Sequence, residues 1–365
     1  MEIINKLKLK DAGTNLYAAG FPHFPRNFSR DSLISGILMQ DQNMLKDQLI
    51  FCAKKQGKKR DPITGEEPGK IFHEYPGVDI KNLGFLTTYN ACDTTALYLI
   101  AHEVYFKLTK DKTLLEDQKE NIKKAIKYIL SHMKDGFFYE SPKFCGAEKF
   151  ALRNTYWKDS EIINRENGTP EYPVIYTLAH IQNLAGLKSA SKILNSKILK
   201  KISETMIKNL KKLYDKKLKT FYIAIDKLGP IRGISSDSLH ALFYLDKEDL
   251  SIEKINNIVD SSKVLESSLG YKTTNASGSK YGGFDYSLQV WPFEQALINA
   301  GAKKFKLPKV IEVSSRILNY LKKVKSYPEL LIVSENEVIK RGCDPQLWTI
   351  ATKEYFSNKK EKVFL

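Results

Sequence analysis

Apolar residues recur at three- and four-residue spacing along most of the 365-residue chain, which is the pattern of amphipathic helices. Runs with the length and composition of strands are few. Two of them, "FYIAI" at 221–225 and "LLIVS" at 330–334, fit small hairpins on a helical scaffold. The pattern therefore predicts a mainly α-helical protein with about ten helices. The ranges expected to be helical are 31–56, 91–109, 112–134, 171–186, 188–214, 235–245, 251–266, 287–301, 305–325 and 344–357.

The connections between these helices contain no Gly-rich boundary, Pro-rich linker or low-complexity segment. One loose polar stretch, residues 54–70, contains Gly and Pro and is interpreted as an excursion between the first two helices. It is a poor domain linker, because the helix before it could not form a domain alone. Length alone permits one large domain or two ordinary ones. We predict a single domain spanning residues 1–365.

The charge balance is strongly basic, with 58 Lys and Arg against 42 Asp and Glu and a net charge of +16. Most of the excess is Lys on helix faces, as in residues 192–217, without the interleaved aromatic residues of a base reader. Nucleic acid is therefore not expected as a partner. The charge fits either an anionic substrate or a generally Lys-rich composition, and the second interpretation is favoured.

The four cysteines stand far apart, with no CxxC pair and no His at metal-ligand spacing. This spacing disfavours both a zinc site and a disulfide framework. The N-terminal residues lack the apolar core of a signal peptide, and no apolar run reaches 18 residues. These observations predict a cytoplasmic protein without a membrane partner.

Aromatic and charged residues gather in the connections instead of the helix interiors, where Leu, Ile and Lys dominate. Loops rich in rigid aromatic side chains on a regular frame are where binding and catalysis commonly lie. The segments of this kind are 21–32, 69–77, 87–93, 154–161, 281–294, 327–331 and 342–348.

The segment "FSRDS" (28–32) has two interpretations. Ser29 is a suitable N-cap, and Asp31 in the first turn of a helix suits the macrodipole. Arg30 is not explained by capping. An Arg–Asp pair that enters a pocket presents a planar donor group and a carboxylate acceptor to neighbouring hydroxyls of one sugar. Capping and sugar binding both remain open from these residues.

The segment "YWKDSE" (156–161) is the strongest candidate for acid chemistry. Trp157 could simply pack, and Asp159 could cap a short helix. Alternatively, Trp157 forms a hydrophobic wall that raises the pKa of Asp159, so that this carboxyl stays protonated and acts as a general acid. Lys158 would oppose that shift, so its side chain must face elsewhere or contact the substrate.

A second carboxylate is needed, and two are available. Glu329 lies between Pro328 and Leu330, an apolar context that is either accidental or functional. Glu294 is a competing candidate base, although its position in an amphipathic helix also suits surface exposure. Trp291 and Trp348 lie at or near helix starts, as core anchors or pocket walls.

In chain order, these segments resemble the glucosidase domain of glycogen debranching enzymes and, more loosely, the six-hairpin (α/α) toroid glycosidases. The matches to the family's elements are "FSRDS" (28–32) to "WGRDT", "GKIFHE" (69–74) to "GKIPHE", "YNACDT" (89–94) to "YNTVDA", "YWKD" (156–159) to "TWMD", "VWPFE" (290–294) to "WP", "PELL" (328–331) to "PELT" and "CDPQLWT" (343–349) to "CxxQAWS". Seven short matches in one order are far more specific than any single one.

The resemblance implies an all-α (α/α)6 toroid with small β-hairpin insertions and an inverting, exo-acting glycoside hydrolase. The implied substrate is an α-glucoside at the end of an oligosaccharide or glucan. Asp159 would be the general acid and Glu329 the base that activates water. The implied substrate-binding residues are Arg30, Asp31, His73, Glu74, Tyr89, Asp93, Trp157, Lys158, Trp291, Gln346 and Trp348.

The implied partner is a carbohydrate, and neither a metal nor an organic cofactor is expected. Three alternatives on the same scaffold remain. The first is a hydrolase of another small glycoside, such as a trehalose- or mannosylglycerate-like compound. The second is a phosphorylase, which would need no base, and the third is a sugar-binding protein without turnover. The residues do not indicate an oligomeric state.

Overall fold

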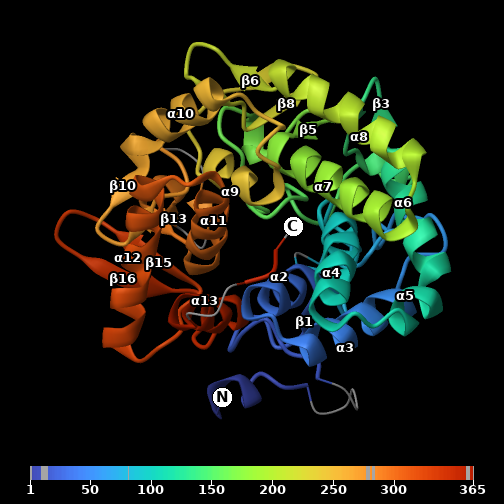
Figure 1. The fold of residues 1–365 in the computed structure, drawn as a ribbon, viewed down its shortest axis with the longest axis horizontal. Coiled ribbons are helices and arrows are strands. Elements are labelled where there is room, and N and C mark those ends of the chain that lie inside the picture. The colour runs from blue at the N-terminus through green and yellow to red at the C-terminus, as the bar shows by residue number, and fades with distance from the viewer. Residues whose placement is uncertain are drawn as a thin grey trace.

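Six helices form an inner ring, and their order around it follows the chain (Figure 1). The structure is a computed structural model that describes residues 2–9, 15–80, 82–276, 280–281, 284–358 and 362–364. Each inner helix packs on the next, and the last packs on the first, so the ring is closed. The inner helices are α2 (Ser29–Met39), α4 (Thr94–Thr109), α7 (Thr177–Leu194), α9 (Asp237–Tyr244), α11 (Pro292–Phe305) and α13 (Leu347–Ser357).

Small residues let the inner helices approach one another closely. A Cβ atom on Gly186 of α7 would lie 3.0 Å from the Cα atom of Ala96 in α4. A Cβ atom on Gly301 of α11 would lie 2.7 Å from the backbone nitrogen of Phe243 in α9. Interiors are packed as densely as organic crystals, so larger side chains at these two positions would push the ring apart.

A second layer of amphipathic helices surrounds the ring and explains where the Lys-rich segments lie. The helix at residues 197–209 buries Leu199 and Met206 on its inner side, while most of its lysines face outward. The positive charge is thus spread over solvent-facing helix surfaces. The outer helices are α3 (Gln42–Lys54), α6 (Lys119–Ser131), α8 (Lys197–Asn209), α10 (Ile252–Ser261) and α12 (Pro308–Val324).

In the described part of the chain, the helices of eight or more residues therefore number eleven, close to the ten expected. The prediction of one helix over 31–56 is wrong. Gln40 adopts a left-handed conformation that ends α2, and the Asp41 carboxylate accepts hydrogen bonds from the next backbone amides to begin α3. Two short helices, α1 (Glu2–Asn5) and α5 (Thr113–Asp117), complete the set.

The outer side of α13 has no long partner helix among the described residues. Instead, Ile3, Ile4 and Leu7, in and just after α1, pack in a cluster with Leu347 and Ile350 of α13. A short N-terminal segment thus covers the position where a sixth outer helix would lie. The predicted excursion near 54–70 is confirmed as part of the connection between α3 and α4, in which the residues that the structure describes form no helix.

All described strands are short and pair antiparallel. The segments 221–225 and 330–334, which were predicted to form small hairpins, contribute to strands of this kind. The longest hairpin joins β15 to β16, with Leu331 opposite Lys340. The strands are β1 (Asn27–Phe28), β2 (Glu74–Tyr75), β3 (Met133–Lys134), β4 (Phe137–Phe138), β5 (Ile175–Tyr176), β6 (Tyr214–Asp215), β7 (Thr220–Phe221), β8 (Ala224–Asp226), β9 (Gly229–Ile231), β10 (Glu266–Ser267), β11 (Gly270–Tyr271), β12 (Lys280–Tyr281), β13 (Phe284–Asp285), β14 (Gln289–Val290), β15 (Leu330–Val333) and β16 (Val338–Arg341).

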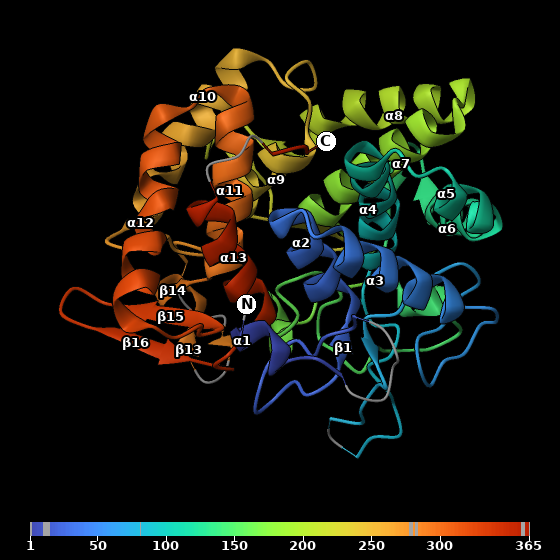
Figure 2. The ribbon, with the colours of Figure 1, turned by 60° about the horizontal axis from the view of Figure 1, so that its bottom comes forward.

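The inner helices begin at one end of the ring, where several strands and long loops gather. β1 immediately precedes α2, and β14 lies just before α11. Both strands lie with β15 and β16 in the lower half of Figure 2, below the inner helices that they precede. The predicted aromatic connections are thereby brought to the same end of the ring.

The interior of the ring is apolar and continuous, and its main cluster draws residues from every inner helix. All four cysteines, Cys52, Cys92, Cys145 and Cys343, are buried free thiols. Among the described helices, none combines the length and apolar character needed to cross a membrane.

Candidate active site

A pocket of about 280 Å³ opens at the end of the ring where the inner helices begin. Both predicted catalytic carboxylates line it, although they come from loops far apart in the sequence. The loop of Asp159 precedes α7 and that of Glu329 precedes α13, two helices on opposite sides of the six-membered ring. The lining residues are Ala19, Phe24, Arg26, Phe28, Arg30, Asp31, His73, Glu74, Val78, Ile80, Leu152, Trp157, Asp159, Ser160, Trp291, Glu329, Gln346 and Trp348.

The carboxyl of Asp159 is in a setting that favours its protonated form. Burial raises the pKa of Asp159 from its usual 3.8 to about 6, against the opposing effect of Arg30 and with a smaller contribution from the negative charge of Glu74. The Nη1 atom of Arg30 lies 3.8 Å from its Oδ2 atom, and 23% of the Asp159 side chain is exposed. This carboxyl can therefore hold a proton up to about pH 6 and still reach the pocket.

Glu329 is held by the backbone of the opposite wall. Its Oε2 atom accepts a hydrogen bond of 2.9 Å from the amide of Cys343, and its own amide donates to the Cys343 carbonyl at 2.8 Å. Gly342 makes this approach possible, because a Cβ atom there would lie 2.2 Å from Oε2 of Glu329. The φ angle of Gly342 is also +73°, which favours glycine. The Glu329 carboxylate thus has a fixed position.

Two pairs of charged and polar residues fix the base of the pocket. Arg30 donates from Nε and Nη2 to both oxygens of Asp93, at 2.9 and 3.0 Å. Asp31 accepts a hydrogen bond of 2.9 Å from the Nε2 atom of Gln346. Burial raises the pKa of Asp31 well above its usual range, Arg30 opposes the shift, and Glu329 and Asp159 add to it. The Nη1 atom of the Arg30 guanidinium faces Asp159.

Aromatic rings enclose the pocket at the predicted tryptophans. The rings of Trp157 and Trp291 meet edge to face at 5.7 Å, and Trp291 meets Trp348 in the same way at 5.7 Å. Trp348 also stacks on Phe293 with the ring centres 4.1 Å apart. The Trp157 indole donates a 2.8 Å hydrogen bond to Asp237, which fixes the wall next to Asp159. Such rings offer apolar faces to the C–H groups of a ligand.

Among the residues that the structure describes, three buried polar atoms on the pocket lining have no hydrogen-bond partner. They are Nδ1 of His73, Oε1 of Gln346 and Nε1 of Trp348. Burial, together with Arg30 and Arg26, lowers the pKa of His73 well below its usual value, so the ring is neutral. Buried polar groups are rarely left unpaired, so these atoms are suited to ligand hydroxyls.

Three of the predicted substrate-binding residues do not line the pocket. Tyr89 turns its hydroxyl toward the Lys55 carbonyl, to which it donates at 2.7 Å. Asp93 lies behind Arg30 and is fully buried. Lys158 points away from Asp159 and donates to the Ser235 hydroxyl at 2.7 Å. The side chains of these three residues thus contact other parts of the protein, and Asp93 fixes Arg30.

Glu294, the competing candidate base, is also outside the pocket, and its expected surface exposure is wrong. It is completely buried, accepts a 2.7 Å hydrogen bond from Ser236 and lies 3.6 Å from Nδ1 of His240. Glu294, His240 and Asp237 bring their ligand atoms within 4.8 Å of one another, the one group of described residues with a spacing that could hold a metal ion. The ammonium of Lys158, 3.1 Å from Asp237, already supplies a positive charge there.

Several lining residues were not predicted, notably Phe24, Arg26 and Phe28. Arg26 pairs with Glu74, and its guanidinium lies 5.1 Å from the centre of the Phe28 ring. These residues belong to the aromatic segment 21–32, which was recognised as a whole but not resolved into individual roles. Ile80 and Leu152 carry no motif, and only the folded loops place them here.

Comparison with known proteins gives matches at the level of structure only. No family model matches the chain, and no curated protein sequence matches it either. A crystal structure of GH63 mannosylglycerate hydrolase from Thermus thermophilus in complex with Tris and D-glycerate is similar, with a TM-score of 0.73 and 10% sequence identity over 98% of each chain. The complex of that enzyme with glucose gives a TM-score of 0.71, 11% identity and the same coverage. The chain therefore has the (α/α)6-toroid fold, as predicted.

Proposed function

We propose that this protein is an inverting, exo-acting glycoside hydrolase, with a terminal α-glucoside as its substrate. The observation that carries the proposal is one pocket whose lining includes two carboxyl groups from opposite sides of the ring, Asp159 and Glu329. One of these, Asp159, has the raised pKa of a general acid. Around them lie the aromatic rings and unpaired polar atoms that a sugar requires. The small volume, about 280 Å³, suits one terminal sugar unit.

The chemistry follows from the two carboxyl groups. Asp159 donates its proton to the glycosidic oxygen as the bond to the anomeric carbon breaks. Glu329 takes a proton from a water molecule, whose oxygen attacks the opposite face of that carbon. Inversion needs carboxyl groups roughly 6.5–9.5 Å apart to admit the water. Asp159 and Glu329 come from loops on opposite sides of the ring, which supports a separation of this size between their carboxyl groups.

The remaining lining residues would bind and orient the sugar. Asp31 and the Oε1 atom of Gln346 accept hydrogen bonds from hydroxyls, while the Trp348 indole donates one. Arg30 lies against Asp159 and limits how far its pKa rises. Asp159 has a pKa raised by burial, and Glu329 is held by backbone hydrogen bonds, so the acid and the base lie in different environments.

A second candidate is hydrolysis of a small glycoside of the mannosylglycerate type. It is favoured by the structural similarity to mannosylglycerate hydrolase across 98% of both chains. The sequence motifs favour the glucosidase instead. The two candidates share the mechanism and differ only in the sugar and its leaving group.

The test is hydrolysis of a panel of α- and β-linked glucosides and mannosides, including mannosylglycerate, with the released anomer followed by proton NMR. We expect release of the β-anomer from an α-glucoside and loss of several orders of magnitude in both Asp159→Asn and Glu329→Gln. The matched controls are Asp285→Asn and Glu335→Gln, which do not line the pocket. Turnover that survives Glu329→Gln would refute the assigned base, and sugar binding without turnover would refute the enzyme.

A further inference from the structure

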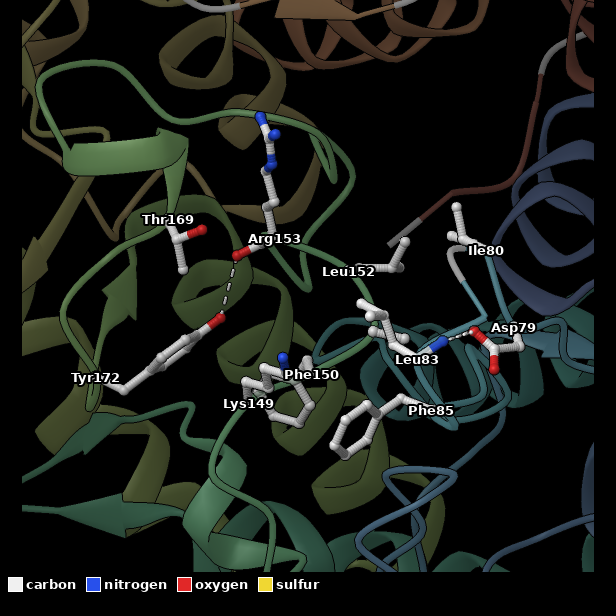
Figure 3. Close-up of a pocket in the computed structure, with 11 residues that line it drawn as sticks. Asp79, Ile80, Leu83, Phe85, Lys149, Phe150, Leu152, Arg153, Thr169 and Tyr172 are labelled. Carbon is white, nitrogen blue, oxygen red and sulfur yellow. Dashed lines mark hydrogen bonds between the residues drawn. The ribbon is translucent and has the colours of Figure 1, made fainter.

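A second, mainly apolar pocket adjoins the pocket of Asp159 and Glu329. Ile80 and Leu152 line both, so the two pockets are neighbours that share one wall. The second pocket has a volume of about 260 Å³ (Figure 3). Its remaining lining residues are Asp79, Leu83, Phe85, Lys149, Phe150, Ala151, Arg153, Thr169 and Tyr172.

This second pocket lies on the side of the general acid. Leu152 and Arg153 are a few residues upstream of Asp159 in the same loop, and the amide of Asn154 donates to the Asp159 carbonyl. Arg153 also pairs with Glu161, just beyond Asp159. A general acid protonates the oxygen that departs with the leaving group, so the leaving group lies on the acid's side of the sugar. The second pocket is where the aglycone would extend.

The polar groups of the second pocket are mostly engaged already. The Tyr172 hydroxyl donates to the Arg153 carbonyl, and the Asp79 carboxylate accepts from the amide of Leu83, as Figure 3 shows. The Arg153 guanidinium points away from the Phe150 and Phe85 rings (Figure 3). A sugar in this position would exchange its hydration for few new hydrogen bonds, which is costly.

The apolar groups, in contrast, are open to a ligand. Ile80 and Leu83, which both line this pocket, are 53% and 52% exposed, which is unusual for large aliphatic side chains. Phe150 and Tyr172 meet edge to face at 5.6 Å, and the Lys149 ammonium lies 5.5 Å from the centre of the Phe85 ring. Covering these side chains with an apolar group would be favourable.

We infer that this protein acts on glycosides with an apolar aglycone, aryl or alkyl, which binds between Leu83, Phe85, Phe150 and Tyr172. The inference rests on the proposed hydrolase function and adds the class of leaving group. A second sugar or a small hydroxy acid as leaving group would need polar partners in the same place, so substrates of those kinds are expected to bind less tightly than glycosides with an apolar aglycone.

The test compares methyl, hexyl and benzyl glycosides of the sugar and anomer that the panel identifies. Alkyl leaving groups differ little in acidity, so the ratio of kcat/KM for hexyl to methyl glycoside reports binding of the chain. Each buried methylene is expected to raise that ratio roughly fourfold. Leu83→Asn is expected to lower the ratio by about tenfold or more, whereas Leu228→Asn, at a 72% exposed leucine outside the pocket, keeps it.

A ratio near one in the wild type, or a ratio unaffected by Leu83→Asn and Phe85→Ala, would overturn the inference while leaving the hydrolase intact. Binding of benzyl alcohol, followed by saturation-transfer NMR, separates the two proposals. Binding to the wild type that is lost in Leu83→Asn supports the apolar pocket even where every glycoside is inert, an outcome that refutes only the proposed function. Absence of benzyl alcohol binding to the wild type counts against the pocket.

Discussion

Replacing the proposed general acid, Asp159, should inactivate the protein and at the same time increase its stability. The pKa of Asp159 rises from its usual 3.8 to about 6, chiefly through burial, with Arg30 opposing. The folded protein therefore binds this proton more tightly than the unfolded chain does. Between pH 3.8 and 6 the folded state loses stability as the pH rises, and the loss is complete above pH 6. A shift of this size corresponds to about 3 kcal/mol.

Asp159→Asn removes the charge and keeps the shape, so it should recover much of that free energy at neutral pH. For a chain of this length, about 3 kcal/mol raises the melting temperature by roughly 4 °C. The gain should be present at pH 7.5 and much smaller at pH 4, where the wild-type carboxyl is already protonated in the folded state and about 40% protonated in the unfolded one. Thermal unfolding of wild type and variant at the two pH values measures it directly.

A control of opposite sign is available at Asp226. Although burial raises its pKa, hydrogen bonds and charge from Arg165 dominate and lower it. Asp226→Asn should therefore lose stability at pH 7.5 and lose less at pH 4. Equal melting temperatures for wild type and Asp159→Asn at pH 7.5 would refute the burial argument. So would a kcat/KM profile for the wild type without a basic limb near pH 6.

Three further changes test the surrounding site. Gly342→Ala should reduce kcat by at least roughly 100-fold, because the added Cβ atom displaces the Glu329 carboxylate. The control is Gly146→Ala, at a glycine with a φ of +88° and open space around it, which introduces the same kind of backbone strain and should leave kcat near the wild-type value. Lys158→Met should lower the free energy of unfolding by about 3 kcal/mol, measured by chemical denaturation, because it leaves Asp237 without its ion pair. The double variant Lys158→Met, Asp237→Asn should recover part of that loss. An unchanged unfolding midpoint for Lys158→Met would contradict this prediction. Trp348→Phe keeps the stacking on Phe293 but loses a donor, so KM should rise about 5- to 10-fold with kcat little affected, and an unchanged KM would remove the indole from sugar binding.

The sequence was most informative where periodicity and local motifs act alone. Helical spacing located most helices but not all of their boundaries. The pair Gln40–Asp41 is one place where it failed, because a single left-handed residue followed by a good cap divides a continuous apolar pattern. The ring itself is not encoded in any one segment. It depends on close approaches such as Gly186 against Ala96, which a one-dimensional pattern cannot show.

For the site, motifs singled out Asp159, Glu329 and the tryptophans, which all line one pocket, while side-chain direction could not be inferred. Lys158 is the clearest example, since its neighbours Trp157 and Asp159 line the pocket and it turns toward Ser235 instead. The partners that draw it away lie 77 or more residues further along the chain. Long-range partners of this kind decide which residue of a motif faces the ligand.

The closure of the ring also sets the order in which the site can be made. The hydrogen bond from Gln346 to Asp31 joins residues 315 positions apart. During synthesis, α2 and the loop of Asp159 leave the ribosome long before Glu329 and α13 exist. Until then α2 has an uncovered apolar side, and the pocket has an acid without its opposite wall. Contacts of such sequence separation slow folding, so the growing chain depends on its last inner helix to be protected from aggregation.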